Sequence, residues 1–275
     1  MANFGQMLSS FLIFAVAIIG PIFLFGFLIQ LISRRFYRLC GENSKAVAYA
    51  TGWLGTPVHE LSHALMCLIF GHKILEIKLF QMDCEDGVLG YVRHSYNPKN
   101  FYQRLGKFFI GVAPIVIGCL ILTLLMLALV NSFFVDALYR VDIIYDVVMG
   151  TAPAIEGFRQ FFSIFGSFFL QVTNPLWWVY FVLGMFLALH MNLSPADIKG
   201  SIAGMIFLLI VFFVLAIILG LVGVGTLASI TADFVFVGLM LLLILSQSLF
   251  FCLVWWLGAY LVTIPKRKRE KKRNR

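Results

Sequence analysis

Charged residues are scarce in this chain: only 12% of its 275 residues are Asp, Glu, Lys or Arg, while 61% are apolar. A soluble domain carries about 25% charged residues, so the composition excludes an ordinary soluble protein. Paired cysteines are also lacking, because the five cysteines are scattered without the spacing of a disulfide framework or a cysteine-rich zinc knuckle. The first apolar stretch, 11–32, has no preceding Lys or Arg and no small-residue cleavage site, so we expect a retained membrane helix rather than a signal peptide.

The net charge of +8 comes largely from one end of the chain, since eight of the 21 Lys and Arg residues lie in 266–275. We interpret this run as a solvated basic tail beside the anionic lipids of a bilayer. Nucleic acid is therefore not an expected partner.

Apolar runs of about 20 residues are needed to cross about 30 Å of hydrocarbon as a helix. The sequence therefore predicts an all-α polytopic membrane protein with about six transmembrane helices. The predicted spans are 10–33, 46–70, 107–131, 172–192, 202–224 and 234–263.

Two connections between these spans have patterns of their own. Apolar and charged residues alternate in 75–79, a turn signal stands at Asp86-Gly87, and a second short run covers 88–93. This pattern predicts a small β-hairpin within the polar insert 71–106. The connection 132–171 mixes aromatic, aliphatic and charged residues, and we expect one or two interfacial amphipathic helices there.

The distribution of Lys and Arg sets the expected orientation. An even number of spans, the basic tail and the basic insert place both termini on the cytoplasmic side of an integral multi-pass protein of the plasma membrane. The four basic residues within 34–45 oppose this orientation, because they would then lie outside.

A metal-binding pattern lies in the second predicted span, where His59, Glu60 and His63 form H-E-x-x-H. Residues i and i+4 share one helix face, so the two imidazoles can bind one metal ion, and Glu60 can act as base toward a water on that ion. Ionisable groups inside a membrane helix are costly and usually functional. The alternative is a purely structural role, in which these side chains only hydrogen-bond to neighbouring helices.

A catalytic zinc ion usually takes a third protein ligand. Cys67 stands about 12 Å along the helix axis from His59, too far to share one ion with it, and we assign it to packing. His72 and His94 in the polar insert are interpreted as surface or interfacial histidines.

The end of the fourth span offers an acid in this role, Asp197, with no obvious helix-capping function. Asn192, Ser194 and Pro195 are expected to open the helix just before it and to leave polar groups facing a cavity.

With these motifs the chain resembles the site-2 protease family of intramembrane zinc metalloproteases. His59, Glu60 and His63 match that family's first motif, and Asn192, Pro195, Asp197 and Gly200 resemble its second motif. The usual Leu-Asp-Gly of the second motif is replaced here by Ala196-Asp197-Ile198, which leaves His190 as the alternative third ligand. The hairpin insert also resembles the family's membrane-associated β-loop.

The resemblance covers 46–200 and implies a metalloprotease-like membrane core there. It is preceded by an N-terminal helix with a basic connection (1–45) and followed by two membrane helices (201–264) and the basic cytoplasmic tail (265–275).

The implied activity is regulated intramembrane proteolysis by a zinc hydrolase whose substrates are membrane proteins or membrane peptides. Zn²⁺ held by His59, His63 and Asp197 would activate a water, and Glu60 would take its proton. Asn192 would donate to the substrate backbone or to the developing oxyanion, or else to a neighbouring helix. The hairpin could hold an unwound substrate segment by β-addition, or simply rest on the bilayer surface.

Rival functions remain open at this point. A peptidase of the kind that trims prenylated proteins also buries H-E-x-x-H, but its third ligand is a Glu on a later helix, in a pattern that we do not find. A zinc transporter or sensor would use the same imidazoles without needing Glu60 as a base. A non-catalytic membrane client-binding or immunity protein would not depend on Glu60 at all.

Overall fold

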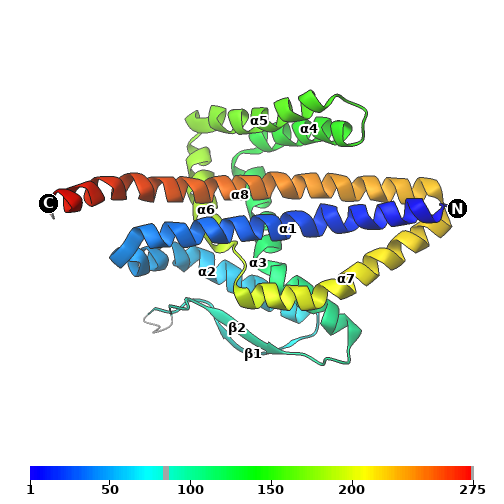
Figure 1. The fold of residues 1–275 in the computed structure, drawn as a ribbon, viewed down its shortest axis with the longest axis horizontal. Helices are drawn as coiled ribbons and strands as arrows, with labels where there is room; N and C mark the ends of the chain where they lie inside the picture. The colour runs from blue at the N-terminus through cyan, green and yellow to red at the C-terminus, as the bar shows by residue number, and fades with distance from the viewer. Residues whose placement is uncertain (83–86, 274–275) are drawn as a thin grey trace. The chain divides into compact units, whose positions relative to one another are not determined.

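The computed structural model describes residues 1–82 and 87–273, with side chains as far as residue 263. Most of these residues are helical, and two short strands form the one sheet found among them, so the predicted all-α class with a small hairpin is confirmed (Figure 1). Short 3-10 turns, η1 (Gly41–Asn43) and η2 (Gln171–Thr173), follow α1 and α5. The helices are α1 (Phe4–Cys40), α2 (Ser44–Ile69), α3 (Phe101–Leu129), α4 (Asn131–Val148), α5 (Ala154–Leu170), α6 (Pro175–His190), α7 (Pro195–Val222) and α8 (Val224–Arg273).

The chain is embedded in a membrane, because its long helices expose large apolar side chains. Phe27 and Leu12 on α1 and Ile206 on α7, for example, are each more than half exposed, and lipid is the solvent that such surfaces match. Four helical runs of the described residues are long and apolar enough to cross a bilayer: Phe4–Ile69, Phe101–Leu129, Pro195–Val222 and Val224–Thr263.

The predicted number of six spans stays a prediction. The run Phe4–Ile69 contains both α1 and α2, separated at Gly41, where φ is +56°. The predicted span 172–192 corresponds to α6, which is apolar but has only 16 residues.

Two compact units make up the chain. The first contains 1–23, 119–182 and 206–245, and the second contains 24–118, 183–205 and 246–275. Every candidate metal ligand and catalytic residue belongs to the second unit, so the site is described within that unit alone.

In the first unit, α4 and α5 lie side by side (Figure 1). The guanidinium of Arg140 on α4 donates to Asp136 (2.8 Å) and to Gln160 on α5 (2.8 Å), and the rings of Phe133 and Phe168 meet at 5.2 Å. The hydrogen bond from Arg140 lowers the pKa of the Asp136 carboxyl. The connection 132–171 therefore forms two helices, as expected, held to each other by polar and aromatic contacts.

In the second unit, strands β1 (Lys73–Lys78) and β2 (Tyr91–Ser95) pair antiparallel, with a register irregularity between Ile74 and Glu76. The hairpin is confirmed, but the second strand lies further along the chain than the predicted 88–93. Of the predicted turn, Gly87 has φ +70° and Asp86 lies outside the described residues. The connection is thus longer than a tight turn.

Candidate metal centre

Two imidazoles on α2 converge, with the Nε2 atoms of His59 and His63 3.1 Å apart. The Nδ1 atom of His59 lies 2.7 Å from the backbone carbonyl of His190, and that of His63 lies 2.7 Å from the carbonyl of Ile110. A carbonyl only accepts, so each Nδ1 carries a proton, and in the neutral rings both Nε2 atoms present lone pairs toward each other. Such an arrangement is unfavourable unless a cation or a proton lies between them. Backbone acceptors of this kind orient metal-binding histidines.

The carboxylate of Asp197 completes what we call the first cluster, made of His59, His63 and Asp197. Its Oδ1 lies 3.4 Å from Nε2 of His63, and its Oδ2 lies 3.8 Å from Nε2 of His59. All three ligand atoms lie within 4.8 Å of one another. In a tetrahedral zinc site with bonds of about 2.0 to 2.1 Å, such atoms stand about 3.3 Å apart. The first cluster therefore fits a zinc ion after small side-chain movements.

The same carboxylate also caps α7, which the sequence analysis did not anticipate. The backbone N–H of Ser194 donates to Oδ2 of Asp197 (2.8 Å), and the backbone N–H of Asp197 donates to Oγ of Ser194 (3.1 Å). This is a capping box, so the statement that Asp197 has no capping function was wrong. The two roles are compatible, because the capping bond holds the carboxylate in place while Oδ1 faces His63.

A close approach of two helices positions both sides of the first cluster. Gly111 on α3 lies against the start of α7, where a Cβ would overlap the carbonyl oxygen of Asp197 and the side chain of Ser201. The preceding residue, Ile110, supplies the carbonyl that accepts from His63. Glycine at this position thus brings the acceptor and the carboxylate to the same imidazole.

His190, the alternative third ligand, lies elsewhere. Its Nδ1 is 3.1 Å from the carbonyl of Phe186, and its ring occupies the space that a Cβ on Gly55 would need. Its contribution to the first cluster is its backbone carbonyl, which accepts from His59. The structure brings Asp197, and not the His190 ring, together with the two imidazoles.

The predicted break before Asp197 is present, since α6 ends at His190 and α7 begins at Pro195. Asn192 lies in this break and donates its Nδ2 to the carbonyl of Leu189 (2.8 Å). The amide therefore has a local backbone partner and also lines a cavity of about 510 Å³.

Glu60 lines this cavity and also a second one. A cavity of about 440 Å³ is lined by the first cluster, by Glu60 and by hairpin residues that include Gly90 and Val92. Glu60 and His59 line the cavity of Asn192 as well. Glu60 is only 7% exposed, and Gly90 packs closely against it. A buried carboxylate thus stands beside the candidate metal position, facing both spaces.

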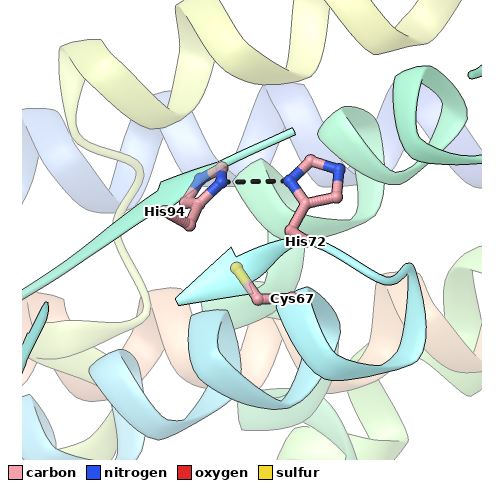
Figure 2. A group of neighbouring side chains, drawn as sticks. All are labelled: Cys67, His72 and His94. Carbon is pink, nitrogen blue, oxygen red and sulfur yellow. Dashed lines mark hydrogen bonds between the residues drawn. The ribbon is translucent and has the colours of Figure 1, made fainter. Parts of the chain in front are cut away.

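A second group of ligand types occurs further along α2. Cys67, His72 and His94 bring one ligand atom each to within 4.8 Å of the others (Figure 2), and we call them the second cluster. Burial, followed by the proximity of His72, lowers the pKa of His94 to about 4. The sequence predicts packing for Cys67 and a surface or interfacial position for His72 and His94, and it does not indicate that the three meet. His72 is only 4% exposed, so it is not a surface histidine.

Comparison with protein-family models, with curated proteins and with solved structures found no significant match. A functional assignment therefore depends on the chemistry of the site itself.

Proposed function

We propose that the chain is an intramembrane zinc metalloprotease of the site-2 protease type, which hydrolyses peptide bonds of membrane-embedded substrates. The single observation that supports this most is the orientation of two imidazoles on a membrane helix. With both Nδ1 atoms donating to carbonyls, the Nε2 lone pairs of His59 and His63 point at each other beside the carboxylate of Asp197.

The donor set suits zinc in a hydrolytic role. Two neutral imidazoles and one carboxylate are a common ligand set of catalytic zinc sites, which keep one position for water. When bound, the ion supplies Lewis acidity that brings the pKa of its water toward 7. His59, His63 and Asp197 would hold it, and the capping bond from Ser194 would keep the carboxylate from turning away.

Glu60 is assigned as the general base and acid. It follows His59 on α2 and lines the same cavity as the three ligands, so it can take a proton from the attacking water and return it to the leaving amine. A positioned general base contributes about 10² to 10⁴ in rate. Glu60 is 7% exposed and packs against Gly90, so its side chain is held at the cavity wall for this proton transfer.

Substrate binding is assigned to the hairpin and to the break between α6 and α7. A membrane helix must unwind before its peptide bonds are accessible, and the segment near Gly90 offers extended backbone at the cavity wall for β-addition. One N–H of Asn192 donates to Leu189, and we assign the second to the substrate backbone or the oxyanion. Six spans, cytoplasmic termini and residence in the plasma membrane belong to the same proposal.

The decisive experiment combines metal analysis with a hydrolysis assay. The full chain, reconstituted into liposomes with zinc, is incubated with a panel of single-span model peptides in ¹⁸O-labelled water, and new termini are detected by mass spectrometry. We expect bound zinc, and ¹⁸O in the new carboxyl groups. Glu60→Gln should retain zinc and lower the rate by about 10² to 10⁴.

Three results would overturn the proposal: wild-type protein that binds no metal when zinc is supplied, cleavage that continues unchanged in Glu60→Gln, or no cleavage of any peptide in the panel. Zinc flux into the same liposomes that is indifferent to Glu60→Gln would indicate the transporter alternative.

A further inference from the structure

We propose that Cys67, His72 and His94 form a second metal site for a zinc-like divalent ion. The ion would link the end of α2 to the end of the hairpin at which β1 begins and β2 ends. The proposal concerns residues that the proteolytic mechanism does not use, and it stands whether or not the first cluster is catalytic.

The end of α2 brings the first two ligands together. Gly71 has φ +67°, a conformation that favours glycine. The N–H of His72 donates to the carbonyl of Cys67 (2.8 Å), and the N–H of Gly71 donates to that of Leu68 (3.2 Å). These two bonds are a Schellman motif, which folds the chain back so that His72 lies beside Cys67.

The ring of His72 is held with one nitrogen facing the cluster. Its Nε2 lies 2.8 Å from the carbonyl of Gln103 at the start of α3, so Nε2 carries the proton and Nδ1 presents a lone pair. The ring of Tyr96 stacks on the His72 ring, with their centroids 5.2 Å apart, and so limits its rotation. An imidazole oriented by a backbone acceptor is the usual arrangement at zinc sites.

Strand pairing supplies the third ligand. His94 on β2 pairs with Ile74 on β1, and its Nδ1 lies 3.0 Å from Nδ1 of His72. Figure 2 shows both rings above the sulfur of Cys67. Three elements, the end of α2, the turn after it and β2, therefore converge on one point.

The donor set and the spacing suit a borderline-soft ion. In a tetrahedral zinc site, two imidazole nitrogens and a thiolate stand about 3.3 to 3.6 Å apart, and the three ligand atoms here lie within 4.8 Å of one another. Because the ligand atoms are already this close, small side-chain rotations, rather than a rearrangement of the backbone, complete the site. Cys67 is fully buried and His72 is 4% exposed. On binding, the Cys67 thiol releases its proton to solvent and coordinates as thiolate.

Such an ion would act on the cavity wall. His94, Gly90 and Val92 line the same cavity as the first cluster, and the ion would join β2 to α2 through His94 and Cys67. A metal at the second cluster would therefore hold the segment around Gly90 against Glu60 and limit opening of the hairpin.

Cobalt substitution distinguishes the two clusters, because only the second contains sulfur. The full-length protein is purified in detergent, stripped of metal and titrated with Co²⁺ alone, and the near-ultraviolet sulfur-to-cobalt charge-transfer band is recorded. We expect the band in wild type and in His59→Ala, which alters only the first cluster. It should disappear in Cys67→Ala and persist in Cys119→Ala, a matched loss of another buried thiol.

His94→Asn, at a half-buried position, is the second variant in case Cys67→Ala does not fold; it should lose the wild-type band or shift it. Zinc content should fall from about two ions per chain to about one in both second-cluster variants and in His59→Ala. A wild-type protein with no charge-transfer band, or a band that survives Cys67→Ala, would overturn the second site. Failure of the proteolytic proposal alone would leave the band in place.

Discussion

The first and second clusters share α2 but differ in what surrounds them. The first cluster has only nitrogen and oxygen donors, opens onto a cavity and stands beside the buried carboxylate of Glu60. The second contains a thiol, and its His72 ring stacks on Tyr96 and donates to the Gln103 carbonyl; of its three members His94 alone lines that cavity. Hydrolytic sites need an open ligand position and a base, whereas thiolate sites more often hold structure together. The proposed catalytic site and the proposed structural site thus each take part of their ligands from α2, His59 and His63 for the first and Cys67 for the second.

The largest effect that separates the clusters should come from Asp197→Ala. Loss of the carboxylate removes a ligand from the first cluster and leaves the second intact, so zinc should fall from about two ions to about one per chain. Elemental analysis of detergent-purified protein measures this. His190→Ala is the control, since it keeps the backbone carbonyl that accepts from His59. Zinc loss in His190→Ala but not in Asp197→Ala would reverse the assignment of the third ligand.

A smaller effect, again on metal binding by the first cluster, is expected for Ser194→Ala. The hydroxyl that receives the Asp197 N–H is removed, while the carboxylate itself is retained. The backbone N–H of Ser194, which holds the Asp197 carboxylate, is kept, so the effect acts indirectly through the start of α7. Metal affinity should therefore fall by at most about 10-fold, the lower end of the range for loss of a group that orients a ligand. Competition with a chelator should detect this weakening at the first cluster, with the cobalt–sulfur band of the second unchanged. Equal weakening of both clusters would mean that the capping box supports the fold as a whole.

The smallest effect concerns Glu76 on strand β1 of the hairpin. A hydrogen bond from the Tyr91 hydroxyl (2.6 Å), assisted by Arg93, lowers the pKa of the Glu76 carboxyl. A lowered folded-state pKa means that the ionised carboxyl stabilises the hairpin above its ordinary pKa of 4.5, and that this support is lost as the pH falls toward the lowered value.

Glu76→Gln imitates that loss at neutral pH. Amide hydrogen exchange of β1 and β2 should become faster, because the ionised carboxyl no longer supports the hairpin. The effect should be small, because the Glu76 side chain is exposed, and the zinc content of the first cluster should not change. Slower exchange, or loss of zinc from the first cluster, would contradict this account.

The first cluster was largely predictable, because its information is local. His59 and His63 are four residues apart on a helix, and the polar break at 191–194, followed by Pro195, marked the place of Asp197. The capping role was missed although Ser194 and Asp197 stand at capping-box spacing, a signal that could have been read. The carbonyls of Ile110 and His190 could not be anticipated, because backbone acceptors leave no mark in the sequence.

The second cluster was not predictable in the same way. Helix geometry separates Cys67 from the ion of His59 by about 12 Å, but it says nothing of ligands that the chain brings back beyond the end of α2. Gly71 directly after an apolar helix is a readable signal for that turn. The pairing of His94 with Ile74 was not readable, because it depends on the register irregularity between Ile74 and Glu76.

The capping box of Asp197 also bears on how an ion comes and goes. The backbone N–H of Ser194 holds the carboxylate, and backbone carbonyls accept from both imidazoles, so each ligand has a partner that does not depend on an ion. Binding of an ion to the first cluster would therefore cost little conformational entropy of these side chains. Exchange of an ion at the first cluster would therefore depend on desolvation and on access through the cavities, and the helices could keep their arrangement while one ion replaced another.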